Sequence, residues 1–349
     1  MAIGRTKREN QLLRDLVACY SPSGKEQAAT EFLIGVFRRR GWSARIDEVG
    51  NVIGEIGQGS PTICFLGHID TVAGEIPLRL EGKRLFGRGT VDAKGPLAAA
   101  ACAAARLPRK FSKRIILVGA VEEESHTSRG ARHIVGQIHP DFVVIGEPSR
   151  WDRITIGYKG ILHYKQIARA SRAHNAAEAP SIGTRTVLLL ADTIKSAEVA
   201  PGSGGPFRAL TVNVRSINTV IEEFAEKVTV TVDMRLPPSV DPDALERQIR
   251  AAAGEAVVDV IEKLPAVVCG KNNRLVRTLL AAIRKQGGHP RFALKTGTSD
   301  MNTVAPIWKC PIVAYGPGDS NLDHTPDEHI DLEEYQRAIA VLETVFLNL

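Results

Sequence analysis

The feature that most constrains the fold is the alternation of short apolar runs with helix-like segments in the first half of the chain. The apolar runs at 62–66, 115–121 and 142–145 have the length of buried strands. Segment 92–105 is rich in alanine and carries Pro96 in its first turn, which predicts a helix. Because strands that alternate with helices favour a largely parallel sheet, we expect an α/β fold.

A second pattern begins after Gly157. Segments 209–217 and 227–235 alternate apolar and polar residues, as strands with one solvent-facing side do. With a helix expected over 183–196, the order becomes the βαββαβ of a small α+β domain. The sequence therefore predicts a catalytic domain made of residues 1–157 and 267–349, interrupted by an inserted domain of residues 158–266.

Composition excludes several classes of protein. No run of about 18 apolar residues occurs, and the polar N-terminus is unlike a signal peptide, so we expect no membrane segment. Five scattered cysteines fit a reduced cytoplasmic compartment. Aromatic residues are only 5% and do not alternate with basic runs, which argues against nucleic-acid binding. The net charge, 45 − 39 = +6, is compatible with an acidic protein partner or with an ordinary surface surplus.

Acidic and histidine side chains follow the expected strands where each strand ends. They are His68, Asp92, Glu123, Glu124, Glu147 and His324. Each could be an ordinary loop or capping residue by itself, but ligands collect at the carboxyl ends of the strands in open α/β sheets. Zinc accepts imidazole nitrogen and carboxylate oxygen, and one shared carboxylate can bridge two metal ions. The set therefore predicts a two-metal site at this edge.

Five motifs carry a resemblance to a known family: 67–72 (GHIDTV), 87–95 (GRGTVDAKG), 122–124 (EEE), 146–149 (GEPS) and 323–328 (DHTPDE). In this order and spacing they resemble the co-catalytic zinc aminoacylase/carboxypeptidase family, which includes acetylornithine deacetylase and succinyl-diaminopimelate desuccinylase. The resemblance implies a zinc-peptidase-like catalytic domain, a ferredoxin-like lid and dimerisation domain at the insert, and a homodimer formed through that lid.

The resemblance also implies the metal ligands. Asp92 bridges two Zn²⁺ ions, with Co²⁺ as a possible substitute. His68 and Glu147 complete one metal, and Glu124 and His324 complete the other. Asp70, two residues after His68, would accept the other imidazole N–H and fix its tautomer.

Two further catalytic roles follow from the same resemblance. Glu123 is expected to be the general base, although a register shifted by one residue would give that role to Glu122. His174, in the lid, is expected to stabilise the oxyanion from the partner subunit, although the sequence before it departs from the family pattern.

Substrate contacts are expected at several positions. Arg235, near the end of a lid strand, matches the family residue that clamps a substrate carboxylate, and Asn213 is a weaker partner. Thr298 and Ser299 lie in a predicted Gly-rich substrate loop over 295–302. Gly318 is expected to bring backbone close to the substrate.

Within the family, the runs KTGTSDMN and YGPGDSNLDHTPDEHIDLEEY most resemble the lysine- and arginine-biosynthesis branch. Those enzymes release lysine or ornithine from the C-terminal glutamate of a small acidic amino-group carrier protein, LysW. The alternative within the same chemistry is a deacylase of free N-acetyl-lysine, N-acetyl-ornithine or succinyl-diaminopimelate. A remote alternative is a metal-free binding module.

Overall fold

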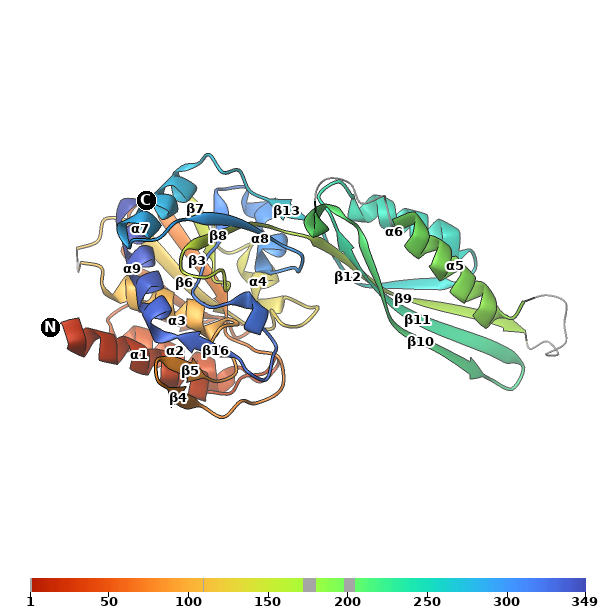
Figure 1. Cartoon of the computed structure of the whole chain (residues 1–349), viewed down its shortest axis with the longest axis horizontal. Helices are drawn as coiled ribbons and strands as arrows, with labels where there is room; N and C mark the ends of the chain where they lie inside the picture. Colours follow the sequence, from red (N-terminus) through yellow and green to blue (C-terminus); the bar gives the residue numbers. More distant parts are fainter. Residues whose placement is uncertain (1, 109, 172–179, 198–204) are drawn as a thin grey trace. The chain divides into compact units, whose positions relative to one another are not determined.

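The computed structural model describes residues 2–108, 110–171, 180–197 and 205–349. The chain forms two compact units (Figure 1). Unit 1 consists of Met1–Gly157, Cys269–Leu294 and Ser299–Leu349, and unit 2 of Tyr158–Val268 and Lys295–Thr298. Within the segment 267–349, residues Lys295–Thr298 group with unit 2, and the Lys295 carbonyl accepts a hydrogen bond from the N–H of Lys159 at 3.1 Å.

A mixed sheet forms the centre of unit 1. Its strands run in the order β1 (Ser43–Ile46), β2 (Val52–Ile56), β6 (Arg114–Ala120), β3 (Thr62–His68), β7 (Phe142–Ile145), β15 (Ile312–Ala314), β8 (Arg153–Tyr158) and β13 (Val267–Val268), and β14 (Arg291–Lys295) pairs with β8. The four neighbours β6, β3, β7 and β15 are parallel. The predicted α/β fold is therefore confirmed, and the carboxyl ends of four strands share one edge.

One apolar core joins this sheet to five helices. These are α1 (Ala2–Ala18), α2 (Gln27–Arg39), α3 (Lys94–Ala105), α7 (Arg274–Lys285) and α9 (Leu332–Asn348). Helix α3 is buried from Lys94 to Ala104, and its alanines leave room for neighbouring elements to approach closely. Strand β3 is buried from Ile63 to His68, as expected of a strand covered on both faces. This packing fixes the strand ends that carry the polar side chains.

Smaller elements complete unit 1. They are α4 (Arg129–Ile134), α8 (Asp300–Trp308), the 3₁₀ turn η2 (Ser320–Leu322) and a three-stranded sheet ordered β16 (His329–Asp331), β5 (Arg84–Phe86) and β4 (Arg79–Glu81). The sequence predicts a loop over 295–302, but in the structure helix α8 begins at Asp300. Helix α8 begins there because Ser299 caps it, with the Ser299 side chain accepting from the Met301 N–H and the Asn302 side chain accepting from the Ser299 N–H.

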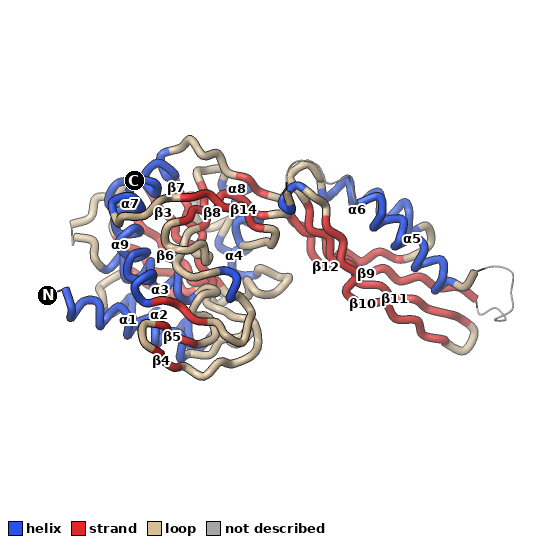
Figure 2. Tube along the Cα trace, in the orientation of Figure 1, coloured by secondary structure: helices blue, strands red, loops and turns tan. Residues whose placement is uncertain are grey.

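Unit 2 is a four-stranded sheet covered by two helices. The strands run in the order β10 (Thr211–Ile221), β11 (Ala225–Leu236), β9 (Gly160–Ser171) and β12 (Val257–Leu264). Helices α5 (Ile182–Ala197) and α6 (Pro242–Ala253) lie along one face (Figure 2). Alternate residues of β11, from Val228 to Leu236, are buried beneath them. The short elements η1 (Pro206–Arg208) and β13 (Val267–Val268) complete the unit. Among the described residues, no helix is long and apolar enough to cross a bilayer.

Candidate metal centre

The polar side chains predicted at the strand ends do meet at one edge of the unit 1 sheet. His68 is the last residue of β3, and Glu124 follows β6 by four residues. Glu147 follows β7 by two residues, and His324 lies in the loop after β15. Because β3, β6, β7 and β15 are parallel neighbours, their carboxyl ends bring these side chains together.

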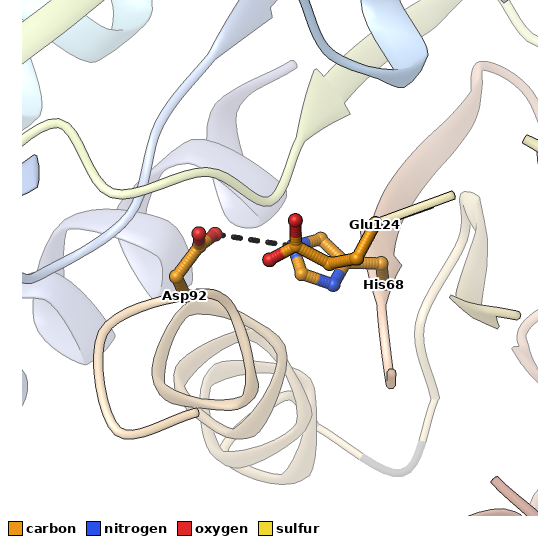
Figure 3. A group of neighbouring side chains, drawn as sticks. All are labelled: His68, Asp92 and Glu124. Carbon is orange, nitrogen blue, oxygen red and sulfur yellow. Dashed lines mark hydrogen bonds and ion pairs between the residues drawn. The ribbon is translucent and has the colours of Figure 1, made fainter. Parts of the chain in front are cut away.

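Asp92 lies between the two histidines. Its Oδ1 is 3.2 Å from His68 Nε2, and its Oδ2 is 3.0 Å from His324 Nε2. Figure 3 shows the Asp92, His68 and Glu124 side chains turned toward one another. Each carboxylate oxygen of Asp92 thus faces a different imidazole, which is the arrangement that a bridging ligand needs.

The remaining carboxylates divide the cluster into two halves. Glu147 Oε1 is 3.9 Å from His68 Nε2, and Glu124 Oε1 is 3.0 Å from His324 Nε2. Ligand atoms of His68, Asp92 and Glu124 all lie within 4.8 Å of one another. One half contains His68 and Glu147, the other contains Glu124 and His324, and Asp92 belongs to both.

The chemistry of this donor set fits divalent metal ions. Burial, and after it the charge of Asp92, raise the pKa of Glu124 to about 7, although the hydrogen bond with His324 opposes the shift. Buried carboxylates that repel one another need cations nearby. Two imidazoles and three carboxylates are the nitrogen and oxygen ligands that zinc accepts. These five residues would hold the ions.

Asp70 fixes the loop beside the cluster. The backbone carbonyl of Asp70 lies 3.0 Å from His68 Nδ1, and its Oδ1 lies 3.5 Å from the same atom. Both contacts favour a proton on Nδ1, which leaves the Nε2 lone pair toward Asp92. The Asp70 carboxylate also accepts the backbone N–H groups of Glu123 at 3.1 Å and Glu124 at 3.0 Å. Asp70 therefore orients both an imidazole and the acidic turn.

The acidic turn separates two adjacent glutamates. The Glu122 carboxylate accepts a hydrogen bond from Thr127 Oγ1 at 2.7 Å and pairs with Arg129 at 3.2 Å. The pKa of Glu123 is raised, first by burial and then by the charge of Glu147, against the opposing effect of His68. The Glu122 carboxylate is thus bound to Thr127 and Arg129, outside the metal cluster. The pKa of Glu123, by contrast, is shifted by charges of the cluster itself.

Glu328 is a site residue whose role the sequence does not indicate. Its side chain is fully buried, and its Oε2 accepts a hydrogen bond from Arg88 at 2.8 Å. Its Oε1 accepts the backbone N–H groups of Gly89 at 3.0 Å, Val91 at 2.9 Å and Asp92 at 3.1 Å. One carboxylate therefore fastens the loop that carries Asp92. The only hint in the sequence was its place four residues after His324.

Three of the expected substrate residues lie in unit 2. Arg235 pairs with Asp233, with Nε 3.2 Å from Oδ1, and donates from Nη1 to Thr298 Oγ1 at 3.2 Å. Asn213 lies on β10 directly opposite Asp233 in the strand register. Residue 174 lies outside the described residues.

Two other expected substrate residues lie in unit 1. Ser299 is the buried N-cap of α8. Gly318 has φ +108°, and a Cβ there would lie 2.8 Å from Val91 Cγ1, so a side chain would be both strained and crowded. The N–H of Gly318 donates to Glu334 Oε1 at 3.1 Å.

With this geometry established, the chain can be placed among known proteins. The family model described as peptidase family M20/M25/M40 matches residues 64–348. The chain therefore belongs to this family, a class of metal-dependent hydrolases, which confirms the resemblance inferred from the five motifs and the expectation of an amide hydrolase.

Curated relatives are similar to this chain over nearly its whole length. A [LysW]-lysine hydrolase from Deinococcus radiodurans is 42% identical over 97% of this chain and 96% of its own length. A putative [LysW]-lysine/[LysW]-ornithine hydrolase from Pyrococcus furiosus is 38% identical over 99% of this chain and 98% of its own length. A [LysW]-lysine/[LysW]-ornithine hydrolase from Sulfurisphaera tokodaii is 29% identical over 98% and 94%, respectively.

Solved structures show the same fold. An M20 family metallo-carboxypeptidase from Sulfolobus solfataricus superimposes with a TM-score of 0.80 at 18% identity and covers 97% of this chain and 98% of its own. The aminopeptidase PepT from Bacillus cereus gives a TM-score of 0.77 at 19% identity, with 98% of each chain covered.

Proposed function

We propose that this enzyme releases lysine, ornithine or both from the C-terminal glutamate of the LysW carrier protein, in lysine or arginine biosynthesis. The observation that carries the proposal is the 42% identity, over nearly the whole chain, to a [LysW]-lysine hydrolase. The metal centre supports it, since the scissile bond would be an amide between the glutamate γ-carboxyl and the amino-acid α-amino group.

Two Zn²⁺ ions, or Co²⁺ in their place, fit the ligand set; when bound, they lower the pKa of water and polarise the amide carbonyl. His68 and Glu147 would hold one ion, Glu124 and His324 the other, and Asp92 both. Asp70 would keep the Nε2 lone pair of His68 available to that ion. The positions of these five ligands would therefore determine where the scissile amide of the substrate binds.

Glu123 is the proposed general base. It takes a proton from the attacking water and returns that proton to the leaving amine. Its burial supports this role, because a raised carboxyl pKa brings proton affinity closer to neutral pH. Glu122, held by Thr127 and Arg129, has the contacts of a structural residue.

Arg235 is the proposed clamp for the substrate α-carboxylate, because its planar guanidinium can donate two parallel hydrogen bonds. Thr298 and Asp233 hold the guanidinium in place. We further propose contacts from Asn213, Ser299 and the backbone at Gly318. His174 of the other subunit would supply the oxyanion donor.

A homodimer through the unit 2 lid would complete the site. Strand β10 is at the edge of its sheet, and its apolar side chains are exposed: 46% for Ile217 and 65% for Ile221. Val187 and Leu188 on α5 are also half exposed. A long exposed apolar edge strand favours pairing with another chain, which supports a second copy as its cover. A cytoplasmic location is supported by the five free thiols.

The substrate assignment is tested by parallel kinetics on zinc-loaded enzyme. The substrates are LysW-linked lysine, LysW-linked ornithine and free N-acetyl-lysine. A much higher kcat/KM for a carrier-linked substrate supports the proposal. Preference for free N-acetyl-lysine would contradict it and establish the free-substrate deacylase instead.

A further inference from the structure

The connection between helices α1 and α2, residues 19–26, lies against the loop that follows β3. Ser21 Oγ donates a hydrogen bond to the carbonyl of Ile69 at 2.7 Å. The N–H of Thr71 donates to the carbonyl of Ser21 at 2.9 Å, and the N–H of Ser23 donates to the carbonyl of Thr71 at 3.2 Å. These contacts fasten the connection beside the loop that carries Asp70.

The Ser23 side chain reaches the Asp70 carboxylate, which is fully buried. Ser23 Oγ donates to Asp70 Oδ2 at 2.7 Å, and the same oxygen accepts the N–H of Glu124 at 3.0 Å. The other oxygen, Oδ1, accepts the N–H of Glu123 at 3.1 Å and lies 3.5 Å from His68 Nδ1. Ser23 therefore belongs to the set of hydrogen bonds that fixes the rotation of this buried carboxylate.

The backbone of the acidic turn depends on the same set of contacts. Glu122 has φ +57°, a left-handed conformation that is uncommon for a residue other than glycine. Its N–H donates to Glu26 Oε1 at 3.2 Å, and the N–H groups of the next two residues donate to Asp70. Three successive backbone N–H groups thus point at two carboxylates, as in an anion-binding turn. This backbone determines the directions in which the Glu123 and Glu124 side chains leave it.

We propose that Ser23 is a positioning residue for the metal centre, because its hydroxyl holds the Asp70 carboxylate in the rotation that accepts the N–H groups of Glu123 and Glu124. Ser23 acts through Asp70 and not on the metal ions or the substrate. The inference rests on the proposed function, in which Glu123 is the general base and Glu124 is a metal ligand.

Loss of the hydroxyl removes a charge-assisted hydrogen bond from Asp70 Oδ2. The carboxylate is then free to rotate away from the backbone of the acidic turn. Glu124 would hold its ion less tightly, as happens when a group that orients a ligand is lost. Glu123 would be less well aligned with the attacking water, which lowers kcat.

The test compares Ser23→Ala with Ser23→Thr in the full-length enzyme. Alanine keeps the backbone N–H that donates to Thr71, so the connection stays in place while the hydroxyl is lost. Threonine restores the hydroxyl, and its methyl group can be accommodated because position 23 is only half-buried. Ser23→Ala should bind zinc about tenfold more weakly in competition with a chelator. Its kcat on LysW-linked lysine should fall about tenfold with little change in KM, and Ser23→Thr should match the wild type in both measurements.

Ser43→Ala is the matched control, because Ser43 is an exposed serine on the edge strand β1, which two strands separate from β3. It should behave as the wild type, and Tm establishes that all three variants fold. Wild-type zinc affinity in Ser23→Ala would overturn the proposed role. An equal loss of affinity in Ser43→Ala, or in Ser23→Thr, would overturn it as well.

Failure of the proposed function gives a different result, namely no hydrolysis of LysW-linked lysine by the wild type. The zinc titration needs no substrate and still decides the role of Ser23. Weaker zinc binding in Ser23→Ala alone supports the role, and equal binding in the wild type and all three variants refutes it.

Discussion

The Glu328 carboxylate accepts a hydrogen bond from the backbone N–H of Asp92 at 3.1 Å, and so connects the loop after His324 to the proposed bridging ligand. Backbone held in this way directs the two Asp92 oxygens toward different histidines. We therefore expect Glu328→Gln to lower zinc affinity by about 10- to 100-fold, the usual effect of losing a group that orients a ligand. Zinc titration with a competing chelator measures this directly.

Glu333→Gln is the matched control for that variant, because Glu333 is an exposed acid five residues away that pairs only with Lys83 among the described residues. Its zinc affinity should equal that of the wild type. Circular dichroism and Tm establish that both variants fold. A Glu328→Gln protein that folds and binds zinc like the wild type would show that this residue does not position Asp92.

Glu123→Gln should reduce kcat by about 10²- to 10⁴-fold, because a glutamine cannot accept the proton from water. Zinc content should stay unchanged, since Glu123 is not among the five proposed ligands. Glu122→Gln should retain most activity, because its carboxylate contacts Thr127 and Arg129 rather than the cluster. Metal analysis and steady-state kinetics on both variants check the assignment. The opposite pattern would make Glu122 the base.

Arg235→Lys should raise KM for the substrate about tenfold or more with a smaller effect on kcat, because an ammonium cannot form two parallel hydrogen bonds to a carboxylate. Arg247→Lys, an exposed position on α6, is the control and should behave as the wild type. Steady-state kinetics on a fixed substrate gives both constants. An unchanged KM in Arg235→Lys would place the carboxylate clamp elsewhere.

Glu55 should make the stability of unit 1 pH-dependent. Burial alone would raise the pKa of Glu55, but hydrogen bonds from Arg114 at 2.6 Å and Arg45 at 2.8 Å outweigh it and hold the pKa below its ordinary value of 4.5. The ionised form therefore stabilises the folded state above pH 4.5, and this contribution disappears as the pH falls through the lowered pKa.

Glu55→Gln should accordingly lose about 1 kcal/mol of unfolding free energy at pH 7 and match the wild type in acid below that pKa. Urea unfolding at several pH values provides the measurement. Glu48→Gln, at an exposed position four residues before the start of β2 at Val52, should differ little from wild type at either pH. A pH-independent loss in Glu55→Gln would refute the ionic origin.

The parts of the fold set by local pattern were predictable. The apolar run 142–145 matches β7, and the runs 62–66 and 115–121 locate β3 and β6 to within two residues, so the expected edge of the sheet follows from their order. The start of α8 was missed because the capping side chains Ser299 and Asn302 also suit a loop.

The missed site contacts are non-local. Glu328 reaches Asp92 across more than two hundred residues, and nothing in the sequence around either one shows this hydrogen bond. Asp70 is a second example. Its carboxylate was expected to contact His68, but the hydrogen bonds that it accepts from the N–H groups of Glu123 and Glu124 were not expected. The order of strands and motifs in the sequence predicted which side chains meet at the edge of the sheet. The backbone N–H groups that these side chains accept are visible only in the folded chain.

The most direct test of the account is the intact mass of LysW-linked lysine before and after incubation with zinc-loaded enzyme. The account predicts that the carrier loses the mass of one lysine residue, that free lysine appears in equal amount, and that Glu123→Gln leaves the carrier unchanged. A carrier of unchanged mass, under conditions in which the same enzyme hydrolyses free N-acetyl-lysine, would contradict it.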